Sequence, residues 1–478
     1  MSGFAVIVRR TGAPVLPHEL APFPAPLQAR GPDGVERFTS GAVGVVTTLL
    51  DTGSPTTRPG VHHAYGLVVA GQVRVDAREA LVQQLRAAGR GAAGNAPDVA
   101  LFAEAWAAWG LDAPERVLGD FSAAIYDEAT AELALVRDPF GVRMLYYAIT
   151  NDLVIASNTL RAVLAAPGVA GDLDDDTLAD FIAVGYNEEL STTSFRAVRR
   201  VPPGHALVLR RDGTSRLVQH WTLPQPAILR RPRDDEYPEA FREALAAAVS
   251  DRARSKSVAV MMSGGIDSTA LAALAARAVS PSGVTAVTAD SPPGITPEEV
   301  PRARKVAASL GIRHVVVGHA APGFPMDDDG EAFDFPEPVD LPDPGFYRLM
   351  FQAMRDASPV GLYGEDPDTL LHPPHLLALL RAMPPWRLAA DVVRTLVVHR
   401  ARPHFGILGA VHDRFRSRHL HDGDLLLAPT FRLRRAARAE ARADPTHRTR
   451  PRVAAIGNAN WQSLLETFDA GVHGVPLE

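Results

Sequence analysis

The chain has 478 residues, of which 46% are hydrophobic and 22% charged, with a formal net charge of -6 and no cysteine. Its length exceeds that of one ordinary domain, and its composition is that of a globular protein. The charge excludes a general attraction to nucleic acid or anionic membrane, and the lack of cysteine excludes disulfides, thiolate metal sites and a cysteine nucleophile. Because it also lacks a signal peptide and a membrane-length apolar run, we expect a multidomain cytoplasmic protein.

Short strands dominate the first half of the chain. Runs of β-branched and aromatic residues bounded by glycine, proline and aspartate are typical of strands. They lie at residues 4–8, 42–50, 65–69, 121–126, 134–137, 145–147 and 206–209. Helical spacing of apolar residues predicts helices only over residues 77–88 and 99–109. Many strands with few helices indicate stacked sheets covered by helices.

The pattern changes after a proline- and arginine-rich linker at residues 224–235. An amphipathic helix is expected first, and strands then alternate with helices. These elements are a helix over 236–251, a strand over 258–262, a helix over 268–279, a strand over 284–288, a helix over 297–310 and a strand over 314–317. This alternation indicates a doubly wound parallel sheet. From about residue 376 the pattern is mainly helical, which adds a helical extension.

A glycine turn with the sequence SGGIDS lies between the all-apolar strand 258–262 and the next helix. Its residues are Ser263, Gly264, Gly265, Ile266, Asp267 and Ser268. Glycines allow the backbone to approach a phosphate closely, and a helix N-terminus presents free N–H groups to an anion. The serine hydroxyls can add donors, and Asp267 can hold Mg²⁺ against a pyrophosphate. The lysine of a Walker A loop is missing. The alternative is an ordinary glycine turn capped by serine and aspartate.

The turn and a series of short motifs resemble the asparagine synthetase family. The motifs are residues 30–33 (RGPD), 118–121 (LGDF), 137–143 (RDPFGVR), 145–147 (LYY) and 201–205 (VPPGH), with the SGGxDS signature of ATP-pyrophosphatases downstream. The resemblance implies an α/β multidomain protein. An Ntn-hydrolase-like layered β-sheet domain of the glutamine amidotransferase type would span residues 1–223. An adenine nucleotide α-hydrolase-like ATP-pyrophosphatase domain would span residues 236–478.

A second acidic motif, LYGEDPD, resembles the family's SGxGxDE loop. The resemblance implies that Gly364 and Glu365 contact the nucleotide and that Asp368 is a ligand of magnesium and pyrophosphate. Here Asp366 and Pro367 replace a glycine and a small residue. Asp366 places a like charge beside Asp368, which can either bind metal or repel phosphate. The alternative is a surface acidic loop.

The amidotransferase half departs from the family at its catalytic positions. Family members that release ammonia begin with a cysteine whose own α-amine acts as the base, whereas this chain has Ser2. An N-terminal serine can itself be a nucleophile, so Ser2 alone leaves the question open. The resemblance also places Val46, Gly71 and Val73 where an arginine, an asparagine and a glutamate grip glutamine. Because a pocket that cannot pair the substrate's charges rejects it, we expect an inactive glutaminase.

Further motifs resemble lasso peptide macrolactam synthetases, which are family members with a disabled glutaminase. They are residues 336–340 (PEPVD), 460–466 (NWQSLLE), 475–478 (VPLE) and 74–79 (RVDARE). The implied cofactors are ATP and Mg²⁺, the latter held by Asp267 and Asp368. ATP would adenylate an Asp or Glu side chain of a precursor peptide, and the peptide's N-terminal amine would close the ring. Glu299 would polarise that amine, or it is simply a solvated glutamate in a first helical turn.

The resemblance carries expectations about partners and alternatives. The implied partners are a precursor peptide, a leader-peptide protease and a leader-recognition protein. The first alternative is an asparagine synthase using glutamine or ammonia, and the second is a degenerate binding scaffold without turnover. The family continues past the VPLE motif into a stretch with a charge-stabilising lysine, so we expect the second domain to be truncated at its C-terminal end.

Overall fold

The computed structural model describes residues 2–54, 56, 60–91, 93–223, 229–290, 298–318, 335–338, 344–364, 384–397, 426–442 and 459–478. The chain forms two compact units. The first contains Met1–Asp174, Glu189–Gly364 and Gln462–Glu478, and the second contains Asp175–Glu188 and Glu365–Trp461. The division into domains at residues 1–223, 224–235 and 236–478 stays a prediction.

Two antiparallel six-stranded sheets build the N-terminal part of the first unit. The first sheet has the order β10-β8-β9-β1-β3-β2. Its strands are β10 (Val198–Arg200), β8 (Tyr146–Ile149), β9 (Leu153–Ser157), β1 (Gly3–Arg9), β3 (Val43–Leu49) and β2 (Gly34–Ser40). The second sheet has the order β12-β11-β7-β6-β5-β4. Its strands are β12 (Ser215–Gln219), β11 (His205–Leu209), β7 (Glu132–Arg137), β6 (Gly119–Asp127), β5 (Leu67–Val75) and β4 (Gly60–Ala64).

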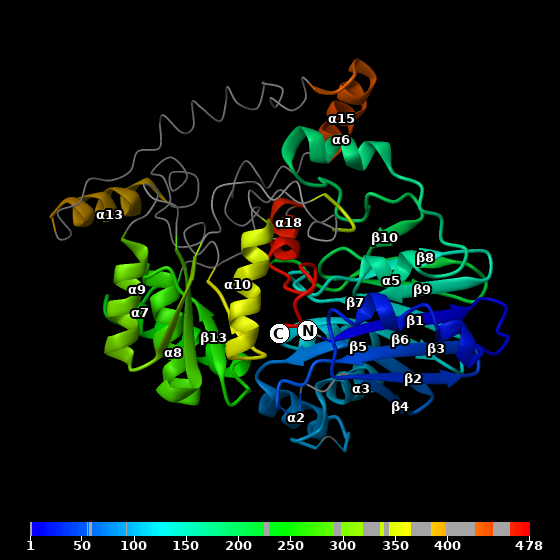
Figure 1. Ribbon diagram of the computed structural model, residues 1–478, viewed down its shortest axis with the longest axis horizontal. Helices are drawn as coiled ribbons and strands as arrows, with labels where there is room; N and C mark the ends of the chain where they lie inside the picture. Colours follow the sequence, from blue (N-terminus) through cyan, green and yellow to red (C-terminus); the bar gives the residue numbers. More distant parts are fainter. Residues whose placement is uncertain are drawn as a thin grey trace. The chain divides into compact units, whose positions relative to one another are not determined.

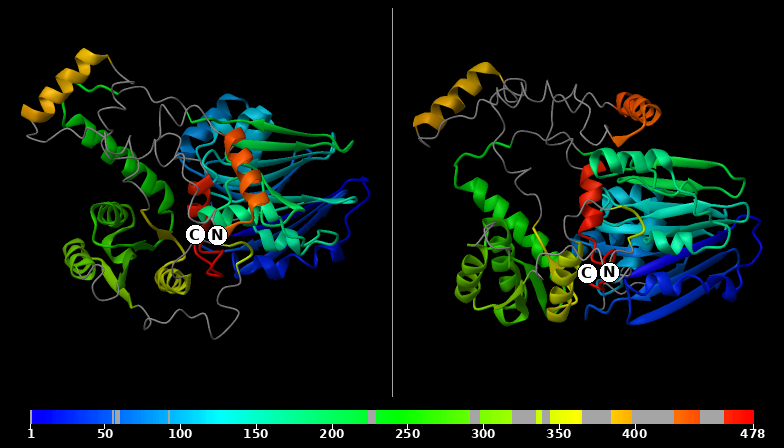
Figure 2. Two further views of the ribbon diagram at one scale, coloured as in Figure 1. Left: turned by 90° about the horizontal axis from the view of Figure 1, so that it is seen from above. Right: turned by 45° about the horizontal axis from the view of Figure 1, so that its top comes forward.

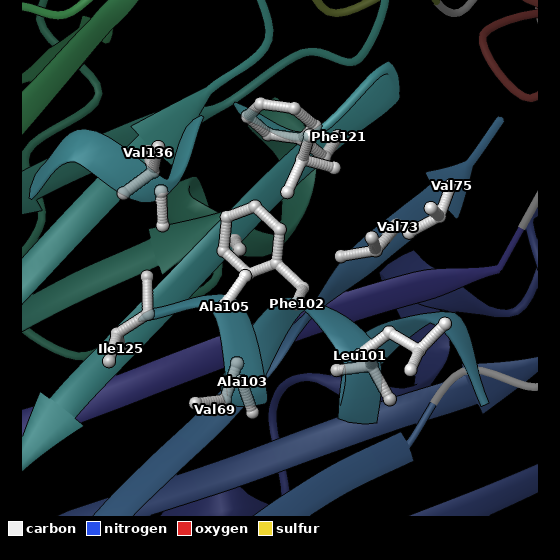
Figure 3. Close-up of a cluster of buried hydrophobic side chains, with 14 of the residues drawn as sticks. Val69, Val73, Val75, Leu101, Phe102, Ala103, Ala105, Phe121, Ile125 and Val136 are labelled. Carbon is white, nitrogen blue, oxygen red and sulfur yellow. The ribbon is translucent and has the colours of Figure 1, made fainter. Parts of the chain in front are cut away.

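The sheets stack face to face, and helices cover both outer faces (Figures 1 and 2). One core cluster joins the inner faces of β1, β3 and β9 to those of β5, β6 and β7. A second packs the outer face of the first sheet against α1 (Pro24–Leu27) and α5 (Leu160–Leu164). A third packs the second sheet against α2 (Arg78–Ala87) and α3 (Asp98–Trp109), with Phe102 of α3 lying against Phe121 of β6 (Figure 3). The strand β1 is buried along nearly its whole length because both of its faces are covered.

A four-stranded parallel sheet forms the rest of the first unit, with the order β15-β14-β13-β16. Its strands are β15 (Arg313–Gly318), β14 (Val284–Asp290), β13 (Val258–Met261) and β16 (Gly361–Leu362). One face packs on α7 (Glu236–Arg252), α8 (Ile266–Val279) and α9 (Glu299–Leu310). The other face packs on α10 (Pro344–Ala357) and on residues 468–477. Helices on both faces are what a parallel sheet requires.

The second unit contains the helices α6 (Asp175–Val184), α13 (Pro385–Val397) and α15 (Pro429–Arg442). Ala179 and Ala183 of α6 pack against Leu427, just before α15. The fully buried carboxylate of Asp180 pairs with Arg435 and Arg438 of α15 at 3.4 and 3.0 Å. The helix α18 (Ala459–Thr467) crosses from the second unit into the first.

These layers confirm the predicted fold class, an α/β multidomain protein with an Ntn-hydrolase-like layered β-sheet domain and a doubly wound parallel sheet. All of the predicted strands are present. The strand predicted over residues 65–69 was too short, since β5 continues through Gly71 to Val75. The edge strands β2, β4 and β12 were not predicted, because their sequences are largely polar and partly exposed. The buried strand β9 and the short strands β10 and β16 were also missed. No helix within the described residues combines the length and apolar character that crossing a membrane requires.

Candidate functional site

The predicted phosphate loop leaves the carboxyl end of β13 and enters α8. Ligands of open parallel sheets bind at this edge. Gly264 has a φ of +80°, and a Cβ there would lie 2.8 Å from the amide nitrogen of Ala303 and 3.1 Å from the carbonyl oxygen of Glu299. Only glycine therefore permits the loop to turn here and to pack on the first turn of α9.

The first turn of α8 has unused backbone donors. Gly265 is the N-cap residue and makes no side-chain capping hydrogen bond. Thr269 donates its amide to the Gly265 carbonyl oxygen at 3.1 Å, which starts the helical ladder. Within the described residues, no hydrogen bond reaches the preceding amides of Ile266, Asp267 and Ser268. An uncapped turn with a positive dipole end is the environment that a phosphate group requires.

Side-chain hydroxyl groups form hydrogen bonds within the loop and at the strand end before it. The Ser263 amide donates to the Ser268 hydroxyl oxygen at 3.2 Å, and the two serine hydroxyls are also 3.2 Å apart. On the neighbouring strand, the Thr288 hydroxyl donates to the carbonyl oxygen of Met262 at 2.6 Å. His314 Nε2 lies 2.8 Å from the same hydroxyl, and burial lowers the pKa of this imidazole. A neutral His314 therefore donates from Nε2 and fixes the strand end from which the loop departs.

The structure brings most, but not all, of the predicted site residues to this edge. Glu299 is the first residue of α9, and its carbonyl oxygen faces the turn. Gly364 follows β16, and a Cβ there would lie 2.9 Å from Leu271 Cδ1 of α8. Glu365 and Asp368 lie outside the described residues. The predicted roles of these residues remain predictions.

The donor set at this edge can be compared with the needs of magnesium and nucleotide. Within the described part of the chain, no group of three or more His, Asp and Glu side chains is placed to hold a metal. Mg²⁺ is commonly held by one or two carboxylates together with substrate phosphates. Asp267, half-buried in the first turn of α8, fits that pattern as one such carboxylate. The open amides and this acid therefore fit a magnesium–nucleotide complex.

Several polar groups around Ser2 are hydrogen-bonded to the protein itself, although Gln72 Nε2 is buried without a partner among the described residues. The Ser2 hydroxyl accepts a hydrogen bond from the Leu50 amide at 3.0 Å. Asn158 Nδ2 donates to the Ser2 carbonyl oxygen at 3.0 Å and to Gln72 Oε1 at 2.9 Å, while Asn158 Oδ1 accepts from the Phe4 amide at 3.0 Å. This network holds the start of β1 in the sandwich.

The residues that the resemblance predicts at glutamine-gripping positions lie in tightly packed parts of the two sheets. Val46 is fully buried in the cluster beneath α1 and α5, and Val73 is buried in the cluster beneath α3. A Cβ on Gly71 would lie 2.5 Å from the Ser122 carbonyl oxygen, because β5 and β6 run close together. None of these residues can pair with the carboxylate or the amine of an amino acid.

Arginines of the N-terminal motifs hold the C-terminal residues of the first unit. Arg30 forms a bidentate pair with Asp469, at 3.2 and 2.7 Å. Arg200 lies between two carboxylates, Glu337 and Glu466, the latter at 3.0 Å. Such buried pairs are costly to break, since removing one partner leaves an uncompensated charge.

The other two motif arginines act in the same way. Arg137 is fully buried and donates to Gln462 Oε1 at 2.8 Å, and Arg143 pairs with Glu478 at 2.6 Å. Sequence reasoning missed these contacts, because Arg137 and Gln462 are 325 positions apart. No local sequence signal marks these contacts, because Asp138 stands next to Arg137 in sequence whereas the observed partners are distant.

Carboxylates of the N-terminal part hold the segment that leads into the parallel sheet. Asp76 pairs with Arg252 at 2.9 Å, and Asp98, which is 1% exposed, pairs with Arg254 at 3.2 Å. Arg252 ends α7, and Arg254 precedes β13. The two sheet systems are thus joined by ion pairs at both ends of the parallel-sheet region.

A layered β-sandwich joined to a parallel sheet with an open-amide glycine turn defines an amidotransferase-type domain attached to a nucleotide-binding domain. Family models agree. The model of the glutamine amidotransferase domain matches residues 1–222, and the model of asparagine synthase matches residues 240–465. The chain belongs to the asparagine synthetase family.

Individual relatives are more distant. A Mycobacterium bovis protein, provisionally named a glutamine-hydrolysing asparagine synthetase, is 29% identical over 272 residues, covering 55% of this chain and 40% of the relative. The amidase chry2 of Gibberella zeae is 28% identical over 219 residues, covering 43% of this chain and 32% of the relative. The chain thus spans at most about two fifths of the length of these relatives.

Among solved structures, a glutamine phosphoribosylpyrophosphate amidotransferase from B. subtilis, complexed with ADP and GMP, is similar to this chain. It is 15% identical, and the match covers 76% of this chain and 80% of that one with a TM-score of 0.33. A TM-score this low does not define a common fold.

Proposed function

We propose that the chain is an AMP-forming carbon–nitrogen ligase that adenylates a carboxylate and then forms an amide bond. The observation that carries this proposal is the uncapped first turn of α8 behind Gly264, at the carboxyl edge of the parallel sheet. Asparagine synthase family membership supports the same chemistry.

The proposed reaction has two steps. The substrate carboxylate attacks the α-phosphorus of ATP, which forms an acyl adenylate and releases pyrophosphate. An amine then attacks the acyl carbon, loses a proton and expels AMP. The amides of Ile266, Asp267 and Ser268 would orient the phosphates, and Asp267 would hold Mg²⁺ together with Asp368. Positioning both reactants in one site supplies the main rate advantage.

The source of the amine is the finer part of the proposal. Ser2 is hydrogen-bonded, and the residues that the resemblance predicts at glutamine-gripping positions are tightly packed, so the N-terminal half would not supply ammonia. We propose that the amine belongs to the substrate itself, with the N-terminus of a precursor peptide closing a macrolactam on an Asp or Glu side chain, as the resemblance to lasso peptide synthetases implies. A leader-peptide protease and a leader-recognition protein would deliver that peptide.

Asparagine synthesis is the second candidate, since several relatives carry that name. A paired assay separates the two candidates. The chain is incubated with magnesium and ATP, first with aspartate plus ammonia, and then with peptides that carry a free N-terminus and an internal Asp or Glu. N-acetylated forms of the same peptides are the control. Macrolactam formation predicts AMP release and loss of one water from the free peptides alone. Asparagine formation would overturn the peptide proposal, and no pyrophosphate in either arm would overturn the ligase proposal.

A further inference from the structure

A cavity of about 270 Å³ lies at the end of the β-sandwich away from Ser2. The strand β1 runs from Gly3 near Ser2 to Arg9, and Val8 and Arg9 line this cavity. Strands from both sheets contribute residues to its lining.

The floor of the cavity is apolar. It is formed by residues that belong to the core between the two sheets, namely Val8, Ala42, Leu133, Val154 and Leu209. An apolar protein cavity of about 150 Å³ can hold benzene. The larger volume here suits a ring with a short chain, or an aliphatic body of similar size.

Tyr126 brings a polar group to this apolar space. Its side chain lines the cavity and is 6% exposed. Within the described residues, no protein group hydrogen-bonds to its hydroxyl, and this oxygen is not among the fully buried atoms. Burial raises the pKa of Tyr126, so the hydroxyl is neutral and available as a donor.

The rim is positively charged. Arg10 donates to the Thr150 carbonyl oxygen at 2.8 Å and lies over Gly213, while Arg211 donates to the Thr11 carbonyl oxygen at 2.8 Å and lies over Gly12. Carbonyl oxygens position a guanidinium without neutralising its charge. These two arginines therefore keep their charge available at the mouth of the cavity.

The other two arginines of the lining are paired with carboxylates. Arg9 pairs with Glu19, and Arg210 pairs with Glu132 at 3.2 Å. The lining carboxylate of Glu128 accepts hydrogen bonds from the Ser40 hydroxyl and from His63 and keeps its negative charge. Arg10 and Arg211 outnumber this carboxylate, so the mouth keeps a net positive charge that favours an anion.

We propose that this cavity binds a small monocarboxylate with an aromatic or aliphatic body. The body lies among Val8, Leu133 and Leu209. The carboxylate accepts a hydrogen bond from the Tyr126 hydroxyl and faces Arg10 and Arg211. The site is independent of the phosphate loop and of amide formation.

Isothermal titration calorimetry on the full chain tests the proposal with 3-phenylpropanoate and its neutral counterpart 3-phenylpropan-1-ol. The acid is expected to bind about tenfold more tightly than the alcohol, because a charge-assisted hydrogen bond contributes about that factor. Arg211→Gln is expected to weaken binding of the acid about tenfold and to leave the alcohol unchanged. Tyr126→Phe is expected to weaken both ligands.

The matched control is Arg216→Gln, which removes an exposed arginine of β12 that does not line the cavity. Its binding is expected to equal that of the wild type. Arg211 is exposed, so its replacement should leave the fold intact, and circular dichroism checks this. Equal affinity for acid and alcohol, wild-type binding by Arg211→Gln, or no measurable binding of the acid would each overturn the proposal.

Discussion

The start of β1 and the start of α8 show how differently one chain treats two inherited catalytic positions. At the start of β1, the Ser2 hydroxyl accepts from the Leu50 amide, and Asn158 donates to the Ser2 carbonyl oxygen and to Gln72 Oε1. At the start of α8, the serine hydroxyls brace the loop, yet the amides of Ile266, Asp267 and Ser268 stay free of protein partners within the described residues. The Ser2 hydroxyl is thus already engaged by the backbone, although Gln72 Nε2 beside it is buried without a partner among the described residues. A site kept for a ligand leaves donors unused.

The largest expected effect concerns the start of α8, where the backbone amides are unbonded within the described part of the chain. Asp267→Asn is expected to lower ATP-dependent pyrophosphate release about 100-fold or more, because it removes a charge that opposes the phosphates through Mg²⁺. The measurement is a coupled pyrophosphate assay with saturating substrate. Glu298→Gln is the control, since Glu298 is exposed and, among the described residues, pairs with Arg302 of the helix α9 that it precedes. A wild-type rate for Asp267→Asn would show that the start of α8 does not act in the reaction, and its contrast with the start of β1 would be lost.

The next largest effect tests whether the buried ion pairs of the N-terminal half stabilise the first unit. Arg200→Met leaves the buried carboxylates of Glu337 and Glu466 without their partner, so the free energy of unfolding is expected to fall by about 3–5 kcal/mol. Urea unfolding followed by tryptophan fluorescence measures it. The control is Arg199→Met at the exposed neighbouring position of β10, where a change below about 0.5 kcal/mol is expected. Equal effects at both positions would show that the buried pairs do not hold the halves together.

A pH dependence sharpens the same point. Burial opposes ionisation of Glu478, but the charge of Arg143 outweighs it and lowers the pKa from 4.5 to about 2. Because the folded pKa lies below the unfolded one, this pair stabilises the fold above pH 4.5 and loses its contribution as pH falls toward 2. The full contribution is about 3 kcal/mol.

Glu478→Gln provides the measurement for this pair. Its stability deficit relative to the wild type is expected to be constant from neutral pH down to about 4.5 and to shrink below that, as urea midpoints at several pH values would show. Glu239→Gln, which removes an exposed pair within α7, should show no such trend. A deficit that does not change with pH would contradict the assignment.

The smallest expected effect concerns Ser2 at the start of β1. Ser2→Cys restores the family's nucleophile, yet glutamine hydrolysis is expected to stay at background, because Val46, Gly71 and Val73 cannot pair with the amino acid's charged groups. Release of glutamate from glutamine is the measurement. Appreciable hydrolysis would mean that a glutamine pocket survives, and the contrast between the starts of β1 and α8 would then disappear.

Much of the fold could be predicted from local sequence, because strand runs such as residues 258–262 and the turn that follows them are local signals. The edge strands were missed, since a half-exposed strand such as β4 carries no clear apolar pattern. The loop residues could be predicted from their glycines and the helix start. The arginine anchors could not, because Arg30 and its partner Asp469 are 439 positions apart. Only the assembled sheets bring such groups together.

The opposed charges at the two ends of the parallel-sheet region have a consequence for the chain as a whole. Before the parallel sheet, Asp76 and Asp98 pair with Arg252 and Arg254. After it, Asp469 and Glu466 pair with Arg30 and Arg200. Fragments separated at the exposed stretch near residue 230 would each be left with stranded ionic groups of both signs. Each fragment would then be a poor folder alone, and the two would be partners for complementation when expressed together.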